Sequence, residues 1–138
     1  MLFRSSTMWD DVGVLRQQAA MQRGLATIQQ HRHDLMQMGV ADGDRRYNVT
    51  WHDWLNLQSL VDISQVITLS ALARENSRGA HYREDFPEPG DFESSCFTRV
   101  HGDVQSLNLE MVPVSFDIVR PGESLLDESA NPKVAQPA

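Results

Sequence analysis

The stretch of twenty residues from Trp54 to Ala73 limits what this chain can fold into more than any other feature. Its single formal charge is Asp62, and it is long enough to cross a bilayer as a helix. Eight of the twenty residues are polar, however, which argues against a transmembrane helix. We therefore expect no direct membrane span and interpret the stretch as a helix inside a protein.

In a helix running from a Thr50 cap, with Asp53 three residues on, to about Asn76, the apolar side chains point in every direction around the axis. These residues are Trp54, Leu55, Leu57, Leu60, Val61, Ile63, Val66, Ile67, Leu69 and Leu72. A helix that is apolar on all sides is typically buried on all sides.

The residues before it predict a partner helix from Val14 to Met38, followed by a connection over 39–49. Its apolar side chains fall along one side, at Val14, Met21, Leu25, Ile28, Leu35 and Met36. Thr7 and Asp10 have the spacing of a capping box for a short preceding helix that Gly13 ends.

Both long helices would be about 40 Å long at 1.5 Å per residue, so they can form an antiparallel pair. The amphipathic partner covers one side of the apolar helix, and the short helix can cover a second side. Another surface must cover the rest. The chain is therefore expected to be part of a larger body.

Residues after about Ser95 favour β-structure. Two runs, 96–100 and 107–111, flank the turn-forming residues His101-Gly102-Asp103 and predict a β-hairpin, which Val114 to Val119 could extend past Pro113. The fold class is thus mainly α, with a C-terminal β-hairpin and a disordered tail over 127–138.

Charge and cysteine content exclude some functions. Nineteen acidic residues against twelve basic ones give a net charge of −7, and no basic run exceeds Arg45-Arg46, so we expect no nucleic-acid partner. The single cysteine, Cys96, cannot form an intramolecular disulfide, and the N-terminus has no apolar run typical of a signal peptide. A reducing, cytoplasmic location is the simplest expectation, and membrane association through a partner subunit stays open as an alternative.

Side chains that can bind anions or transfer protons are most concentrated in residues 77–87, Ser-Arg-Gly-Ala-His-Tyr-Arg-Glu-Asp-Phe-Pro. The run combines guanidiniums, an imidazole, a phenol and carboxylates. Composition alone favours an irregular surface segment whose charges pair with one another or with a neighbouring domain.

As a longer motif, residues 71–87 resemble the C-terminal domain of succinate dehydrogenase and fumarate reductase flavoprotein subunits, a family that includes L-aspartate oxidase. Met8-Trp9-Asp10-Asp11-Val12-Gly13-Val14-Leu15-Arg16 looks like the opening motif of that domain, and Trp54-Leu55-Asn56-Leu57-Gln58 looks like the start of its central helix. The matches occur in the family's order and cover roughly residues 3 to 90.

The resemblance implies a helical bundle of spectrin-repeat type, formed by a short helix and two long antiparallel helices. It also implies a parent FAD-dependent oxidoreductase acting on a small dicarboxylate such as succinate or fumarate. In the family the catalytic residues and the flavin lie in a flavin-binding and a capping domain. This chain has no Gly-x-Gly-x-x-Gly segment, so we expect no catalytic, cofactor-binding or metal-binding residues in it.

Within this picture Arg78, His81, Arg83 and Asp85 are expected to lie at the interface with the flavin domain and to hold it by charge-assisted hydrogen bonds. Arg83→Ala in the full-length protein should loosen that interface and lower flavin retention. The expected division is a bundle with the Ser-Arg-Gly-Ala-His segment over 1–91, a hairpin extension over 92–126 and the tail over 127–138.

The chain departs from the family at 91–98, where respiratory members usually have Asn-Trp and His-Thr motifs. A soluble relative therefore becomes more plausible, although an iron–sulfur or other electron-transfer subunit stays an expected partner.

Two rival hypotheses stay open. One is a free-standing helical interaction module without redox chemistry. The other is a small metal-dependent enzyme that uses His31, His33 and other histidines, although His31 and His33 point about 200° apart on a helix.

Overall fold

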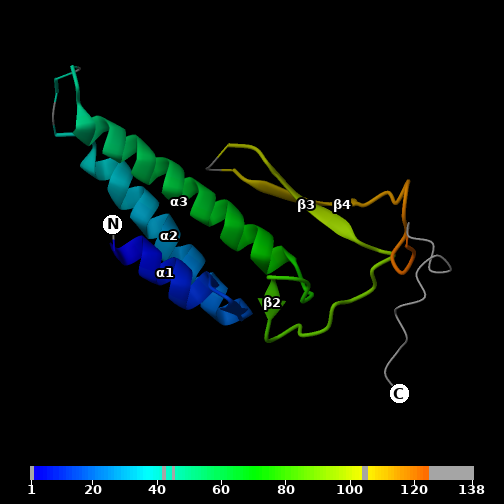
Figure 1. The fold of residues 1–138 in the computed structure, drawn as a ribbon. Helices are drawn as coiled ribbons and strands as arrows, with labels where there is room; N and C mark the ends of the chain where they lie inside the picture. Colours follow the sequence, from blue (N-terminus) through cyan, green and yellow to red (C-terminus); the bar gives the residue numbers. More distant parts are fainter. Residues whose placement is uncertain (1, 42, 45, 104–105, 125–138) are drawn as a thin grey trace, which may run out of the picture.

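The computed structural model describes residues 2–41, 43–44, 46–103 and 106–124. Three helices come first: α1 (Leu2–Val12), α2 (Gln18–Met38) and α3 (Val49–Ala73). An antiparallel β-hairpin follows, built from β3 (Cys96–His101) and β4 (Asn108–Pro113). The two-residue strands β1 (Leu15–Arg16) and β2 (Tyr82–Arg83) pair in parallel at the end of the bundle where α3 finishes (Figure 1).

The antiparallel α2–α3 pair forms most of the core, as the sequence predicts. Met21 and Ile28 of α2 and Val61 of α3 are buried between the helices. Complete burial of such a side chain contributes about 1.5–3 kcal/mol. Arg32 of α2 and Asp62 of α3 add an ion pair of 3.3 Å, so the one charge in the apolar stretch lies between the helices.

Polar residues of α3 also lie on this packed face, and they bond to their own helix. The Ser64 hydroxyl donates to the Leu60 carbonyl at 2.7 Å, and the fully buried Thr68 donates to the Ser64 carbonyl at 2.8 Å. These i to i−4 bonds satisfy the hydroxyl donors within α3 itself. They allow a helix with many polar residues to be buried along one face.

Helix α1 packs against α2 through a close approach at Gly24. A Cβ on Gly24 would lie 2.9 Å from Asp11 Cβ and 3.2 Å from Val12 Cγ2. Any larger residue would push the two helices apart, so Gly24 fixes the distance between them.

Three of the predicted ends of α1 and α3 were wrong. Helix α1 begins at Leu2, so Thr7 lies inside it and is not its cap. Helix α3 is capped by Asn48, whose side chain accepts from the Trp51 backbone N–H at 2.8 Å, and not by Thr50. It ends at Ala73, three residues before Asn76. Asn is the stronger cap because its short side chain reaches the free N–H groups of the first turn.

The second helix does not begin at Val14, as its periodicity suggests. The chain bends at Gly13, and Leu15 and Arg16 pair with Tyr82 and Arg83 before α2 starts at Gln18. The helical spacing of Val14 is therefore accidental, and its side chain is 67% exposed. The chain thus forms a short strand where the periodicity predicts the first turn of the helix, and the partner of this strand lies more than sixty residues later in the sequence.

The hairpin is confirmed, with six residue pairs from Cys96 opposite Pro113 to His101 opposite Asn108. The expected extension over Val114 to Val119 is wrong, because the described chain forms no strand after Pro113. The tail predicted over 127–138 lies outside the described residues. No helix in the described ranges is long and apolar enough to cross a membrane.

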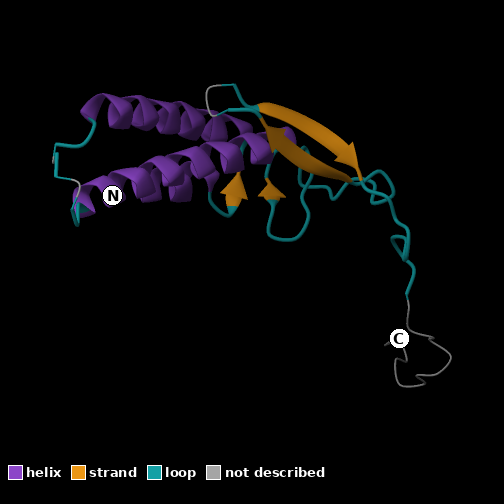
Figure 2. Ribbon diagram, turned by 90° about the horizontal axis from the view of Figure 1, so that it is seen from above, coloured by secondary structure: helices purple, strands orange, loops and turns teal. Residues whose placement is uncertain are grey.

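Helix α3 is not covered on all sides within the described residues, as expected from a helix that is apolar all round with only two partner helices. The α1–α2 pair covers one side and the hairpin lies alongside its C-terminal half (Figure 2). Ile63 and Ile67 nevertheless stay 57% and 44% exposed. Because α3 is apolar on all sides and is only partly covered, these two residues form an apolar strip that no other element packs against in the described structure.

Candidate functional site

The segment 77–87, called here the return segment, folds back against the ends of two helices. Arg78 and His81 exchange backbone hydrogen bonds of 2.9 and 3.1 Å across a tight turn. Gly79 occupies that turn with a φ of +59°, a conformation that favours glycine. The next residues form β2 against β1, and the Glu84 N–H donates to the Arg16 carbonyl at 2.8 Å.

Ser77 fixes the shape of this segment. Its hydroxyl oxygen accepts from the Arg83 backbone N–H at 2.8 Å and donates to the Phe86 carbonyl at 2.8 Å. Its own backbone N–H donates to the Glu88 carbonyl at 2.9 Å. One small side chain thus closes the loop that places the following charged residues.

Arg83 closes the C-terminal end of α3. Its side chain is 1% exposed, and Nη1 donates to the carbonyls of Ala71, Leu72 and Arg74, each at 3.2 Å. The last carbonyls of a helix have no partner within the helix and carry partial negative charge. A guanidinium at this position satisfies several of them at once.

Asp85 joins Arg83 to the start of α2. Its carboxylate accepts from Arg83 Nε at 2.7 Å and from Nη2 at 2.6 Å, and it also accepts from the Gln18 backbone N–H at 3.0 Å. The hydrogen bond from Arg83 lowers the pKa of Asp85 to about 2. The pair therefore places a cation at the C-terminus of α3 and an anion at the N-terminus of α2, as both helix dipoles favour.

Arg78 makes a different set of contacts. Its guanidinium donates to the carbonyls of Pro89 and Asp91 and to the Ser95 hydroxyl, at 2.5 to 2.7 Å. It also lies over the Phe92 ring, 4.5 Å from the centroid. Arg78 thus ties the return segment to the chain that leads into the hairpin.

His81 is 7% exposed and contacts Arg16 across the parallel strand pair. Its Nδ1 lies 2.7 Å from Arg16 Nη1. Because a guanidinium can only donate, Nδ1 accepts and the ring proton is assigned to Nε2. Burial lowers the pKa of His81, and the nearby Arg74 and Arg16 charges lower it further, against a smaller raising effect of the Arg74 backbone. The ring is therefore neutral at pH 7.

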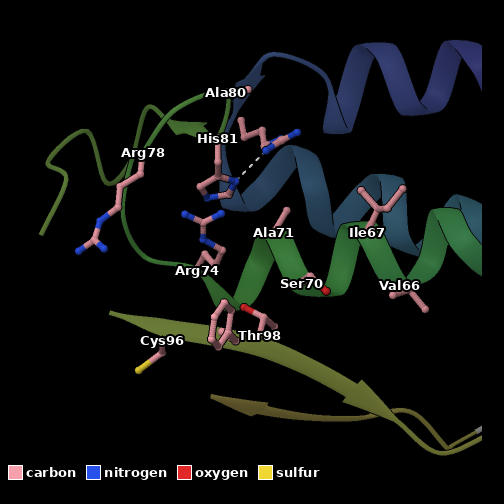
Figure 3. A pocket seen from close by; sticks show the side chains of 12 residues that line it. Val66, Ile67, Ser70, Ala71, Arg74, Arg78, Ala80, His81, Cys96 and Thr98 are labelled. Atoms are coloured by element: carbon pink, nitrogen blue, oxygen red, sulfur yellow. Dashed lines mark hydrogen bonds between the residues drawn. The ribbon is translucent and has the colours of Figure 1, made fainter. Parts of the chain in front are cut away.

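These residues surround a hollow of roughly 670 Å³ that is open to solvent, between the C-terminal half of α3, β3 and the return segment (Figure 3). Its walls are Val66, Ile67, Ser70, Ala71, Arg74, Cys96, Phe97 and Thr98, together with Arg16, Arg78, Ala80 and His81. The hollow combines apolar walls with cationic side chains.

The structure divides the four predicted interface residues into two groups. Arg78 and His81 line the hollow, whereas Arg83 and Asp85 bond to the ends of α2 and α3. Arg16 and Arg74 also line the hollow, although the sequence did not single them out as site residues. Both carried a weak signal, since Arg16 ends the Met8–Arg16 motif and Arg74 lies inside the 71–87 motif.

The described residues do not fit a flavin. Their one parallel strand pair is two residues long, and β1 leads through Gln17 into α2 without the glycine-rich turn that brings a backbone close to a pyrophosphate. They also contain no group of three His, Cys, Asp or Glu residues placed to hold a metal ion. The expectation of no cofactor-binding residues stays a prediction for the whole chain.

Comparison with protein families gives a match over most of the sequence. Residues 5–126 match the family model described as fumarate reductase flavoprotein C-term. Among curated proteins, the succinate dehydrogenase flavoprotein subunit of Coxiella burnetii is 34% identical over 84 residues, which are 61% of this chain and 14% of that protein. L-aspartate oxidase 1 of Ralstonia nicotianae is 36% identical over 81 residues, which are 59% of this chain and 14% of that protein.

A longer alignment comes from the fumarate reductase flavoprotein subunit of Mycobacterium tuberculosis, which is 29% identical over 119 residues. That alignment covers 86% of this chain and 20% of the relative. The chain therefore spans a fifth or less of the length of these relatives.

Solved structures share the fold. The structure of an E. coli quinol fumarate reductase superposes with a TM-score of 0.76 at 22% identity, over 85% of this chain and 20% of that one. A Mycobacterium smegmatis Sdh1 complex gives 0.71 at 26% identity, over 83% and 20%. The resemblance seen in the motifs is confirmed: this chain belongs to the family of fumarate reductase flavoprotein C-terminal domains.

Proposed function

We propose that this chain is the accessory C-terminal domain of an FAD-dependent oxidoreductase that acts on a small dicarboxylate of the succinate or fumarate type. The domain packs against the flavin-binding and capping domains and is not catalytic by itself. The observation that carries the proposal is the family match over residues 5–126.

Two features support a packing role. Ile63 and Ile67 form an uncovered apolar strip on α3, and the matched part of this chain makes up only 14 to 20% of the length of the relatives. Exposed apolar strips of this kind mark surfaces that another body covers. The flavin-binding part of a parent protein would supply that body.

Arg78, His81, Arg83 and Asp85 act at this interface in two ways under the proposal. Arg83 and Asp85 hold the ends of α2 and α3 in register, which gives the return segment a fixed shape. Arg78 and His81 lie on the side of the segment that faces the hollow, where the neighbouring domain can reach them. An iron–sulfur or other electron-transfer subunit is a further proposed partner, and the proposed location of the complex is the cytoplasm.

The test is the flavin content of the native protein that carries this chain, beside the flavin content of the 138-residue chain alone. We expect the native protein to absorb as a flavoprotein and the isolated chain to be colourless. Native material that contains this chain but no flavin in any complex would overturn the proposal. That result would favour the free-standing interaction module.

A further inference from the structure

The cations around the hollow have no acidic partner in the described part of the chain. The ion pairs found there join Arg23 with Asp11, Arg32 with Asp62, Arg83 with Asp85 and Arg99 with Glu110. None of them involves Arg16, Arg74 or Arg78. A chain with a net charge of −7 thus gathers three guanidiniums without a carboxylate around one hollow.

These cations also repel one another. The Arg74 charge adds to the effect of burial in lowering the pKa of both Arg16 and His81. Like charges that are close together and partly buried raise the free energy of the folded state, unless an anion lies between them. The arrangement is therefore complementary to a negative group supplied from outside the described residues.

The donors available to such a group are on Arg74 and Arg16. Among the described residues, the Arg74 guanidinium donates only to Asn76 Oδ1, at 3.2 Å. Arg16 uses Nε and Nη1 for the Val12 carbonyl and His81 Nδ1, at 3.2 and 2.7 Å, and keeps its other N–H donors. Figure 3 shows the His81 ring and the Arg74 side chain next to each other, with the Arg78 side chain turned away from both. Arg78 bonds to carbonyls instead and forms part of the wall.

We propose that the hollow receives an Asp or Glu side chain from the flavin-binding part of the parent protein, and that Arg74 and Arg16 hold its carboxylate. This inference rests on the proposed function. Two guanidiniums together offer a carboxylate charge-assisted hydrogen bonds on both oxygens.

The apolar surroundings favour a protein carboxylate over a free anion. Ile67 and Phe97 line the hollow and are 44% and 64% exposed. A small anion would neutralise the cations and leave these side chains in water. An acidic residue carried on a folded domain neutralises the cations and also covers the apolar rim.

Zero-length carbodiimide cross-linking tests this directly. Arg74→Lys places a primary amine at the hollow, and the reagent joins an amine to a carboxylate only when the two are in contact. In the native flavoprotein we expect an amide bond between residue 74 and an Asp or Glu outside this chain, identified by mass spectrometry.

Arg23→Lys is the matched control, since Arg23 is exposed and pairs with Asp11 at 2.9 Å. It should cross-link to Asp11 within the chain and not to the rest of the protein. Arg16→Lys repeats the test from the other side of the hollow and replaces Arg74→Lys if that variant loses its helical circular dichroism.

The outcomes separate the two proposals. A flavin-containing protein in which neither variant joins to an acidic residue outside this chain would overturn the hollow as a carboxylate site and leave the accessory-domain function standing. A cross-link from residue 74 only to a carboxylate within this chain would do the same. Native protein without flavin would overturn the proposed function, and this inference with it.

Discussion

The two sides of α3 are made of similar residues, but the charged side chains near them differ in whether an acidic or basic partner lies within the described chain. On the closed side, towards α1 and α2, each charged group named above has a partner within the chain: Arg32 pairs with Asp62, and Arg83 pairs with Asp85 while it caps α3. On the open side, Arg16, Arg74 and Arg78 surround a hollow without a described carboxylate, next to exposed Ile63 and Ile67.

This contrast shows how one short segment can serve two purposes. Ser77–Pro87 places Arg83 and Asp85 against the ends of α3 and α2, and it places Arg78 and His81 at the hollow. The Gly79 turn and the Ser77 hydrogen bonds to Arg83 and Phe86 give the segment this shape. The contacts of the closed side stabilise the domain, and the open side is the surface that we propose for docking.

The largest expected effect comes from Arg83→Met, which removes the cap of α3 and leaves Asp85 without its cation. We expect a loss of about 3 kcal/mol in the free energy of unfolding, because the last carbonyls of α3 lose the charged donor that satisfies them. Urea denaturation followed by circular dichroism measures it. Arg74→Met is the matched control on the open side and should cost about 1 kcal/mol or less. Equal losses for the two variants would contradict the distinction between the sides.

The close approach of α1 and α2 gives the next effect. Gly24→Val places atoms where a Cβ already meets Asp11 and Val12 at 2.9 and 3.2 Å. We expect about 2 kcal/mol of destabilisation from overpacking, measured by thermal unfolding. Gly43→Val is the control, since a Cβ there meets nothing within 4 Å. A Gly24→Val variant as stable as the parent would show that α1 packs loosely.

Asp85→Asn should cost about 1–2 kcal/mol at pH 7, after allowance for its partial exposure to solvent. The pKa of Asp85 in the folded state is about 2, below its ordinary value of 3.8. Its stabilising effect is therefore present above about pH 4 and is lost as the pH falls from about 4 to about 2. Unfolding free energies of both proteins across this range should converge at the acid end. A difference that persists below about pH 2 would rule out the carboxylate as its cause.

The smallest effect on stability is expected for Ile67→Ser on the open side. The side chain is 44% exposed, so the isolated chain should change by about 0.5 kcal/mol or less. In the native flavoprotein the same variant should weaken the association of this domain with the rest, measured by limited proteolysis at the domain junction. Val61→Ser, at a residue that is 5% exposed, is the control that should destabilise the chain itself.

Much of the fold follows from local patterns. The α2–α3 pair, the hairpin and the Ser-Arg-Gly-Ala-His motif could be predicted because helical period, strand alternation and motif order are properties of neighbouring residues. Helix ends were less predictable. Asn48 and Thr50 are both acceptable caps by residue type, and only the backbone geometry makes Asn48 the cap.

The candidate site could be predicted in part. The motif pointed to the return segment, and hence to Arg78, His81, Arg83 and Asp85, but not to the direction of each side chain. Arg16 and Arg74 join the hollow because β1 pairs with β2 and because α3 ends at Ala73. Neither the pairing of the two strands nor the end of the helix produces a periodic pattern in the sequence.

Residue order alone was thus sufficient for the family, the helical pair, the hairpin and the location of the charged segment, because each depends on residues close together along the chain. Folding in three dimensions settles which guanidinium is buried and which is left without a carboxylate. Arg83 reaches carbonyls nine to twelve residues away, and Arg16 reaches His81 across 65 residues. The partner of a charged side chain is set by contacts that form only when the chain folds. Residue type alone therefore does not predict which guanidinium is buried and which has no carboxylate partner.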